Sequence, residues 1–491
     1  MDQRKLEQLK RALNLKTGAE LETGQGKKPE GECAPGSPQR DVPASLAEGG
    51  PSEDENSLLR RRLRSALGIS GGDEKLKAAP HPGEESETMD PVERVLGGRI
   101  VSRERGSFLL VRHEYPVTTR HGDLELETIL RFSPESAAWI ADDPALCAMD
   151  WGETLFIDTE TTGVAGGAGT VCFLIGVGKF VPDGMFRLDQ CFMRDFDDEE
   201  AMLDFLDEEY PAPSALVSYN GKSFDLPLLR NRHVQHRMSF PWRNTPHFDL
   251  VHAVRRLWKR RIEDCSLASV ERQLLGVIRT GDVPGYQIPR IWLDFLVRRD
   301  PRPLRPVLYH HRFDILSLVT LSGRLAEGLL GRDGRNLDEA DDRLSLLRQC
   351  VKKRDYARAL EVADALLEDE PVPGRLREVH ALRSLSLKRL GRAEAYADAL
   401  WAWYRAFPDD VEAAYLLSGW LASARRDLFL ARRICEETLE KTATSGSFYR
   451  DMAEHPGRIR LENRLSRIIA RIERQSGRKG GSSSELFGEE D

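Results

Sequence analysis

The order of strand-like and helix-like segments between Trp151 and Gly331 constrains the fold more than any other feature of the chain. Three apolar runs come first, LFIDTETTG, TVCFLIGVGKF and MFRLDQCFMRDF, and the turn-forming Pro182-Asp183-Gly184 separates the second from the third. A charged helical pattern over residues 198–209 follows, then the buried-type strand ALVSY, then helical patterns from Phe224 onward. This order predicts an α/β fold around a mixed sheet.

Composition limits what the whole chain can be. It has 491 residues, of which 40% are hydrophobic, enough for at least one sizeable core. No apolar run approaches the length of a membrane span, and the N-terminus lacks the apolar stretch of a secretory signal. The net charge of −8 argues against coating nucleic acid through bulk charge, although a local basic groove is compatible with it. The 7 cysteines are scattered without a C-x-x-C pair, which disfavours structural zinc and fits a reducing cytoplasm.

Shifts in composition divide the chain into five segments. Two short helical patterns, Leu6–Leu15 and Leu58–Ile69, flank a linker rich in Gly, Pro, Glu and Ser near the N-terminus. We expect a mostly disordered extension with these two helices over residues 1–90, a β-rich segment over 91–150, the α/β domain over 151–331, an all-helical domain over 337–475 and a disordered tail over 476–491.

A repeat marks the helical domain. The phrases DYARAL, GRAEAYADAL and DLFLARRI begin at Asp355, Gly391 and Asp427, a spacing of 36 residues. A helical-hairpin period close to this value is typical of tetratricopeptide (TPR) repeats, although the match is imperfect. The pattern predicts a TPR-like solenoid, which would bind a protein partner.

The first candidate site motif lies at the end of the first strand. Asp158 and Glu160 are two residues apart, and on a strand this spacing puts both side chains on one face. Adjacent carboxylates repel each other, and a divalent cation relieves that repulsion. An isolated D-x-E is very common, however, and on its own it favours a helix-capping Asp beside a solvent-exposed Glu.

The second motif is SYNGKSFDLP, in which a strand runs into an Asn220-Gly221 turn and a helix begins. Asp225 lies near the N-terminus of that helix, where the helix dipole favours a carboxylate and where it could also act as a cap. In the third motif, His310 and Asp314 stand four residues apart on one face of a predicted helix. A carboxylate with a histidine one turn away suits a metal ligand beside a general base.

Together the three motifs resemble the DEDD 3′–5′ exonucleases, a branch of the ribonuclease H-like superfamily. D-x-E followed by T-T-G matches the first exonuclease motif, N-G-x-x-F-D-x-P matches the second, and the third supplies the last aspartate. The segments HFDLVHAVRRLWKRRIEDCSLASVERQLLG and DVPGYQIPRIWLDFL narrow the resemblance to the YprB-type ribonuclease H-like domain. The implied fold is a ribonuclease H-like mixed sheet with flanking helices, followed by the all-α TPR-like solenoid.

The resemblance implies a nuclease that hydrolyses phosphodiester bonds with two Mg²⁺ or Mn²⁺ ions. Asp158 would bridge the two ions, Glu160 and Asp314 would hold the ion that carries the attacking water, and Asp225 would bind the second ion. The substrate would be DNA or RNA with a single-stranded 3′ end. Four residues in and beside the first two motifs are expected to contact it: Thr161, Asn220, Lys222 and Ser223.

The third motif departs from the exonuclease pattern. Those enzymes carry Tyr with three intervening residues before the Asp, or His with four, whereas here His310 has the shorter spacing and Tyr309 the longer. Because His310 and Asp314 share a helix face and Tyr309 is rotated away by about 100°, we favour His310 as the group that orients or deprotonates the water. Two rival functions stay open: a non-catalytic nucleic-acid-binding scaffold with a TPR partner module, and a structure-specific endonuclease on the same fold.

Overall fold

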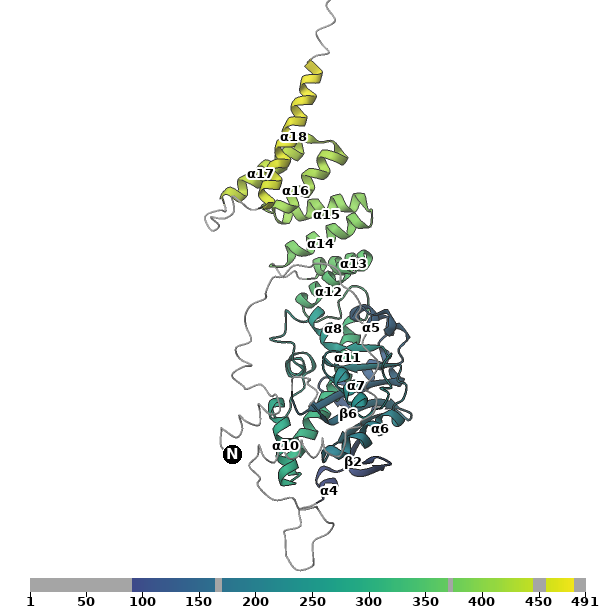
Figure 1. The fold of residues 1–491 in the computed structure, drawn as a ribbon. Helices are drawn as coiled ribbons and strands as arrows, with labels where there is room; N and C mark the ends of the chain where they lie inside the picture. Colours follow the sequence, from purple (N-terminus) through teal and green to yellow (C-terminus); the bar gives the residue numbers. More distant parts are fainter. Residues whose placement is uncertain (1–90, 164–169, 370–373, 445–455, 481–491) are drawn as a thin grey trace, which may run out of the picture. The chain divides into compact units, whose positions relative to one another are not determined.

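The computed structural model describes residues 91–163, 170–369, 374–444 and 456–480 (Figure 1). The extension over residues 1–90, with its two predicted helices, lies outside the described residues. The chain divides into two compact units: the first contains the chain up to Arg255 and Asp264–Ala326, and the second contains Arg256–Glu263 and the chain from Glu327 onward.

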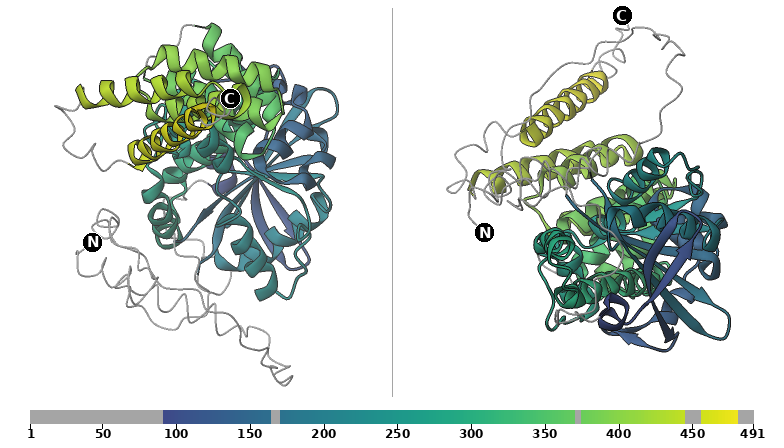
Figure 2. Two further views of the ribbon diagram at one scale, coloured as in Figure 1. Left: turned by 90° about the horizontal axis from the view of Figure 1, so that it is seen from above. Right: turned by 60° about the horizontal axis from the view of Figure 1, so that its bottom comes forward.

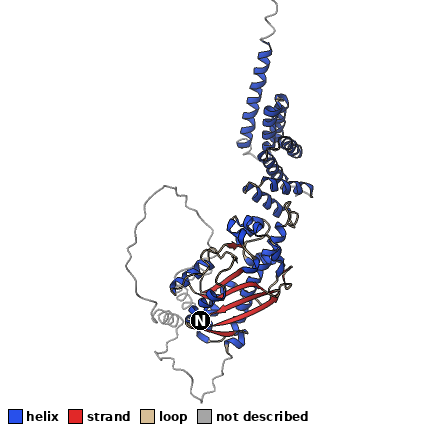
Figure 3. Cartoon of the chain, turned by 90° about the vertical axis from the view of Figure 1, so that its right-hand side faces the viewer, coloured by secondary structure: helices blue, strands red, loops and turns tan. Residues whose placement is uncertain are grey.

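The first unit is built around a seven-stranded mixed sheet in the order β1-β2-β7-β6-β5-β8-β9 (Figure 3). The strands β5, β8 and β9 run parallel to one another, and the neighbouring pairs from β5 out to β1 are antiparallel. The strands fan out with the twist usual for such sheets (Figure 2). Their bounds are β1 Arg99–Arg103, β2 Gly106–Pro116, β5 Thr154–Thr161, β6 Cys172–Val181, β7 Met185–Phe192, β8 Ala215–Ser218 and β9 His247–Asp249; a separate hairpin pairs β3 Arg120–His121 with β4 Leu124–Glu125.

The predicted mixed sheet with flanking helices is confirmed. The three antiparallel strands β5, β6 and β7 are the three apolar runs of the sequence, and Asp183 and Gly184 both adopt positive φ (69° and 70°) in the tight turn between β6 and β7. Asp and Gly tolerate positive φ better than most residues, which explains the Asp-Gly pair in this three-residue turn. The helices of this part of the chain are α4 Val92–Leu96, α5 Pro134–Ala141, α6 Glu199–Glu209, α7 Asp225–Gln235, α8 Leu250–Leu257, α9 Leu267–Val270, α10 Ile288–Arg298 and α11 Arg305–Leu329.

Two sequence expectations about this unit were wrong. The segment 91–150 is β-rich only in its first half, since short helices occupy most of it beyond Leu126, and β1 and β2 extend the same sheet through pairing with β7. The strand β9 falls where helical patterns were expected, because its three residues are too few to give a periodic signal.

The two faces of the sheet are covered by different helices. Leu155 and Ile157 of β5 belong to a core that also contains residues of α6, α7 and α10. The opposite face receives α11, which approaches β6 so closely that a Cβ on Gly176 would lie 2.1 Å from Ile315 Cδ1 and 2.4 Å from His311 Cε1. Glycine in β6 therefore lets α11 lie directly against the strand that neighbours Asp158.

The second unit is helical. Its helices are α12 Ala340–Lys352, α13 Tyr356–Glu368, α14 Leu376–Arg389, α15 Ala393–Ala406, α16 Val411–Trp420, α17 Leu428–Thr444 and α18 Pro456–Gly480, and each packs on the next. The repeated phrases mark helix starts: Asp355 caps α13 by accepting from the Arg358 amide at 3.1 Å, and Asp427 accepts from Leu430 at 2.9 Å as α17 begins. Gly391 has the positive φ (71°) that the turn before α15 requires.

The C-terminal helix is longer than its sequence pattern indicates. The prediction of a disordered tail over 476–491 is wrong for residues 476–480, which continue α18, and residues 481–491 lie outside the described residues. Within the described part of the chain, no helix has both the length and the hydrophobicity needed to cross a lipid bilayer.

Candidate metal centre

The carboxyl end of β5 carries the first two candidate ligands. Asp158 and Glu160 lie on the face of the strand that α11 covers, and both are partly exposed where the core ends. The intervening Thr159 points to the other face, and its hydroxyl donates to Asp225 Oδ1. Side chains alternate between the two faces of a strand, so Asp158 and Glu160 lie on one face of β5 while Thr159, on the other face, contacts the Asp225 carboxylate of the second motif.

The turn before Asp225 is held by hydrogen bonds from buried side chains. Asn220 adopts a positive φ (67°), and Asp249 at the end of β9 accepts from the Asn220 amide at 2.7 Å and the Lys222 amide at 3.1 Å. Ser218 Oγ accepts from the Gly221 amide at 3.1 Å. Asp225 is thereby placed as the first residue of α7, where it is 9% exposed.

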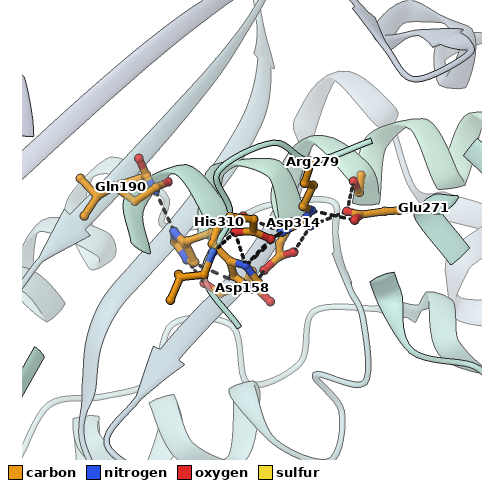
Figure 4. A network of polar contacts seen from close by, with 11 residues as sticks. Asp158, Gln190, Glu271, Arg279, His310 and Asp314 are labelled. Atoms are coloured by element: carbon orange, nitrogen blue, oxygen red, sulfur yellow. Dashed lines mark hydrogen bonds and ion pairs between the residues drawn. The ribbon is translucent and has the colours of Figure 1, made fainter. Parts of the chain in front are cut away.

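The helix α11 supplies the remaining groups. Glu160, His310 and Asp314 each offer a ligand atom, and these atoms all lie within 4.8 Å of one another, a spacing compatible with one metal ion. His310 Nε2 lies 3.4 Å from Asp314 Oδ2. The next residue, His311, is fully buried, and its Nε2 is 3.1 Å from the main-chain oxygen of Asp158. The first and third motifs thus meet at one place, which Figure 4 shows for Asp158, His310 and Asp314, whereas Asp225 of the second motif is outside this ligand group and is reached through Thr159.

The site concentrates negative charge in a poorly solvated region. Burial, followed by the nearby carboxylates of Asp314, Asp225 and Glu160, raises the pKa of Asp158 well above its usual range. The pKa of Glu160 is raised for the same reasons, with Asp314 and Asp225 as its main neighbours. Burial raises the pKa of Asp225 to about 6, although the hydrogen bond from Thr159 opposes this. Such a cluster is expected to gain stability from a bound cation.

One arginine partly compensates this charge, and the sequence motifs did not indicate it. The Arg279 guanidinium forms ion pairs with Asp314 and Glu271 and lies 3.3 Å from Asp282 Oδ2 (Figure 4). Its side chain is 11% exposed and that of Glu271 3%. Ser317 Oγ donates to Glu271, and His121 Nε2 lies 2.8 Å from that hydroxyl. A buried network of ion pairs and hydrogen bonds therefore holds Asp314 in place through Arg279.

His310 has an orienting partner that sequence reasoning also missed. Asp282 Oδ1 lies 2.8 Å from His310 Nδ1, and because a carboxylate only accepts, Nδ1 carries the proton of this contact. Its Nε2 faces Asp314. Tyr309 is placed differently: its ring centroid lies 4.3 Å from that of Phe313, and it lines a small cavity with Arg312.

A second buried histidine connects β7 to the site. Gln190 Nε2 donates to His311 Nδ1 at 2.9 Å, which leaves the Nε2 proton of His311 for the Asp158 carbonyl oxygen. Burial lowers the pKa of His311 to about 4, so the imidazole is neutral at physiological pH. His311 therefore fixes the backbone that carries Asp158.

The four residues predicted to contact nucleic acid lie at the ends of the first two motifs. Thr161 Oγ1 donates to the Gly163 carbonyl oxygen at 3.0 Å. Lys222 and Ser223 are exposed in the turn before α7, and Lys222 Nζ lies 3.8 Å from Asp143 Oδ2. Asn220 forms the turn itself.

The donor set fits Mg²⁺ or Mn²⁺ better than a softer metal. Carboxylate oxygens with a single imidazole are available, and no cysteine is part of the cluster among the described residues. The raised pKa values of three of the carboxylates are what a cation site is expected to show when its charge is uncompensated. The residues present therefore fit the implied divalent metal ions.

Comparison with known proteins relates the first unit to one protein family. Residues 155–326 match the protein family described as RNase_H superfamily. The chain is 28% identical over 319 residues to the "Uncharacterized protein YprB" of Bacillus subtilis (strain 168), an alignment that spans 63% of this chain and 75% of that protein. The first unit therefore contains an RNase H superfamily domain, which indicates a nuclease-type function for it.

Proposed function

We propose that this protein is a metal-dependent 3′–5′ exonuclease that hydrolyses phosphodiester bonds of DNA or RNA by a two-metal mechanism. One observation carries the proposal: carboxylates from the end of β5 and the middle of α11 converge with His310, and Thr159 of β5 hydrogen-bonds the Asp225 carboxylate at the start of α7. The influence of Asp314 and Asp225 on the pKa values of both Asp158 and Glu160 supports a shared site.

The ligands in this proposal are Asp158, Glu160, Asp225 and Asp314. Two Mg²⁺ or Mn²⁺ ions, when bound, would activate a water and neutralise the charge on the leaving 3′ oxygen. Asp158 would bridge the ions, Glu160 and Asp314 would hold one of them, and Asp225 would serve the other. Arg279 would keep Asp314 oriented, since it binds that carboxylate from the buried side.

The role proposed for His310 is to orient or deprotonate the attacking water. Its Nδ1 contact with Asp282 fixes the ring so that Nε2 points toward the site, where an imidazole can serve as a general base. Thr161, Asn220, Lys222 and Ser223 would contact a single-stranded 3′ end. The helical unit, proposed to be a TPR-like solenoid, would bind a protein partner, and the scattered thiols suit a cytoplasmic location.

A product analysis distinguishes this function from its two rivals. The purified chain is incubated with Mn²⁺ and 5′-labelled single-stranded DNA or RNA, and in parallel with circular single strands of the same composition. A 3′–5′ exonuclease gives a ladder of shortening products from the linear strand and leaves the circle intact. Cleavage of the circle would favour an endonuclease, and binding without cleavage would favour the scaffold.

Asp158→Ala and Asp294→Asn provide the matched pair of variants for this assay. Asp158→Ala removes a central ligand and should abolish cleavage, whereas Asp294 lies on α10 with a side chain 44% exposed and should be dispensable. If Asp158→Ala cleaves at the wild-type rate, the site assignment is wrong.

A further inference from the structure

A second cavity lies beside the candidate metal centre, along the outer side of α7. It has a volume of about 550 Å³ and is bounded by α7, by the chain leading into β9 and by the turn that contains Lys222. From α7 it receives Leu226, Pro227, Arg230, Asn231 and Val234. These residues recur at three- and four-residue spacing, so they form one stripe of the helix.

The cavity is lined by positively charged side chains alone among charged groups. Lys222, Arg230 and Arg243 line it, and none of its lining residues is acidic. Arg230 and Arg243 are exposed and have no ion-pair partner among the described residues, whereas Lys222 has only the long contact to Asp143 at 3.8 Å. Many other arginines of this unit pair with carboxylates, as Arg112 does with Asp189 and Arg232 with Glu199. The cavity therefore carries uncompensated positive charge that attracts an anion.

The remaining wall supplies rigid surfaces and a hydrogen-bonding ring. Trp242 is buried and its indole nitrogen donates to the Tyr210 carbonyl oxygen at 2.7 Å, while Phe240 packs edge-on against it. His247 Nε2 lies 2.7 Å from Ser218 Oγ, and burial lowers the pKa of His247 to about 3. Because Ser218 Oγ accepts from Gly221, its own proton is free for Nε2, which leaves Nδ1–H of the neutral ring as a donor.

Neighbouring residues of the sequence form the cavity and the metal centre. Leu226 follows Asp225 directly, and Lys222 belongs to the turn that positions it. The hydrogen bonds that Ser218 Oγ donates to His247 Nε2 and accepts from the Gly221 amide tie the cavity wall to the same turn. A strand that reaches the metal centre across the N-terminus of α7 would bring neighbouring phosphates to the cavity.

We propose that this cavity binds backbone phosphates of the single-stranded nucleic acid, next to the bond that is cleaved. Arg230 and Arg243 are the principal contacts, with Lys222 and Asn231 beside them. This inference rests on the proposed function and adds to it a second binding site for the same strand. Its volume accommodates about a nucleotide, and contacts to phosphate rather than base edges make the binding independent of sequence.

The test uses the full-length chain with Asp158→Asn, which blocks cleavage, and a fluorescein-labelled single-stranded oligonucleotide. Fluorescence anisotropy gives the Kd at several salt concentrations. Adding Arg230→Ala and Arg243→Ala together should weaken binding about tenfold or more and reduce the slope of log K against log salt by about 1.4, since each lost phosphate contact on a single strand contributes about 0.7. Arg298→Ala is the matched control, an exposed arginine of α10 outside the cavity, and should change neither quantity.

The outcomes separate this inference from the proposed function. If the wild-type chain cleaves with Mn²⁺ but the double variant keeps the Kd and the salt slope, the cavity proposal is wrong and the nuclease stands. Calorimetric binding of inorganic phosphate or a nucleoside monophosphate that the double variant loses, with oligonucleotide affinity unchanged, would also overturn it in favour of a small-molecule site. If the wild-type chain neither binds nor cleaves, the proposed function fails and the cavity proposal fails with it.

Discussion

Replacing Asp225 with asparagine removes one negative charge from the metal centre while keeping the shape of the side chain. Burial raises the pKa of Asp225 from 3.8 to about 6 in the folded protein. For a carboxyl group this shift disfavours the ionised form. The stability that the protonated Asp225 carboxyl contributes is therefore present below pH 4 and is lost as the pH rises through about 6.

The shift sets the magnitude of the effect. A difference of about 2 pKa units corresponds to about 3 kcal/mol of unfolding free energy at pH 8, because each unit is worth about 1.4 kcal/mol. Asparagine avoids this cost but weakens the hydrogen bond from Thr159, which offsets about 1 kcal/mol. We therefore expect Asp225→Asn to stabilise the metal-free first unit by about 2 kcal/mol at pH 8, or about 4–8 °C in Tm.

Thermal unfolding in EDTA at pH 8 and pH 4.5, repeated with Mn²⁺, measures the effect. The variant should melt higher than the wild type at pH 8 and within error of it at pH 4.5, where Asp225 is already protonated. Saturating Mn²⁺ should raise the wild-type Tm by mass action and raise that of the variant less. A variant that melts lower than the wild type at pH 8 without metal, or that gains as much from Mn²⁺, would refute the reasoning.

Three further predictions follow from the same contacts. His310→Ala should lower kcat by about 10²–10⁴-fold, whereas Tyr309→Phe should have little effect; the opposite ranking in steady-state kinetics would assign the water-orienting role to Tyr309. Arg279→Met should lower the free energy of unfolding by about 3–5 kcal/mol in urea titrations, because it leaves Glu271 buried without its cation. Adding Glu271→Gln should recover much of that loss. If it recovers none, the unpaired Glu271 carboxylate is not the cause of the loss. A fragment that ends near Gly331 should fold and retain Mn²⁺-dependent cleavage of short oligonucleotides, and an insoluble or molten fragment would mean that the two units share a core.

The sequence predicted the parts of the fold that local patterns encode. The strands β5, β6 and β7 each carry a long apolar run, and an Asp-Gly turn marks the hairpin between the last two. The start of α7 was likewise predictable, because ALVSY ends in an Asn-Gly turn. The structure brings together Glu160 and Asp314, which the resemblance to the DEDD exonucleases assigned to one metal ion, and it places His310 among the possible ligands rather than beside the site.

What sequence reasoning missed depends on contacts between distant segments. Arg279 and Asp282 lie in an irregular segment after α9, where no periodicity distinguishes them from surface residues, and only the fold places them against α11. The Asp249 carboxylate holds the Asn220 turn from a strand that is too short to predict. The pairing of β2 with β7 is similarly non-local, so the extension of the sheet could not be predicted from the alternating pattern alone.

The central claim is that Asp158, Glu160, Asp225 and Asp314 form a centre for two divalent ions. Anomalous diffraction from crystals of the full chain soaked in Mn²⁺ tests it most directly. The account predicts two anomalous peaks beside Asp158, one of them also next to Glu160 and Asp314, and the loss of both in Asp158→Ala. Crystals of the wild-type chain with no peak at these carboxylates would contradict it.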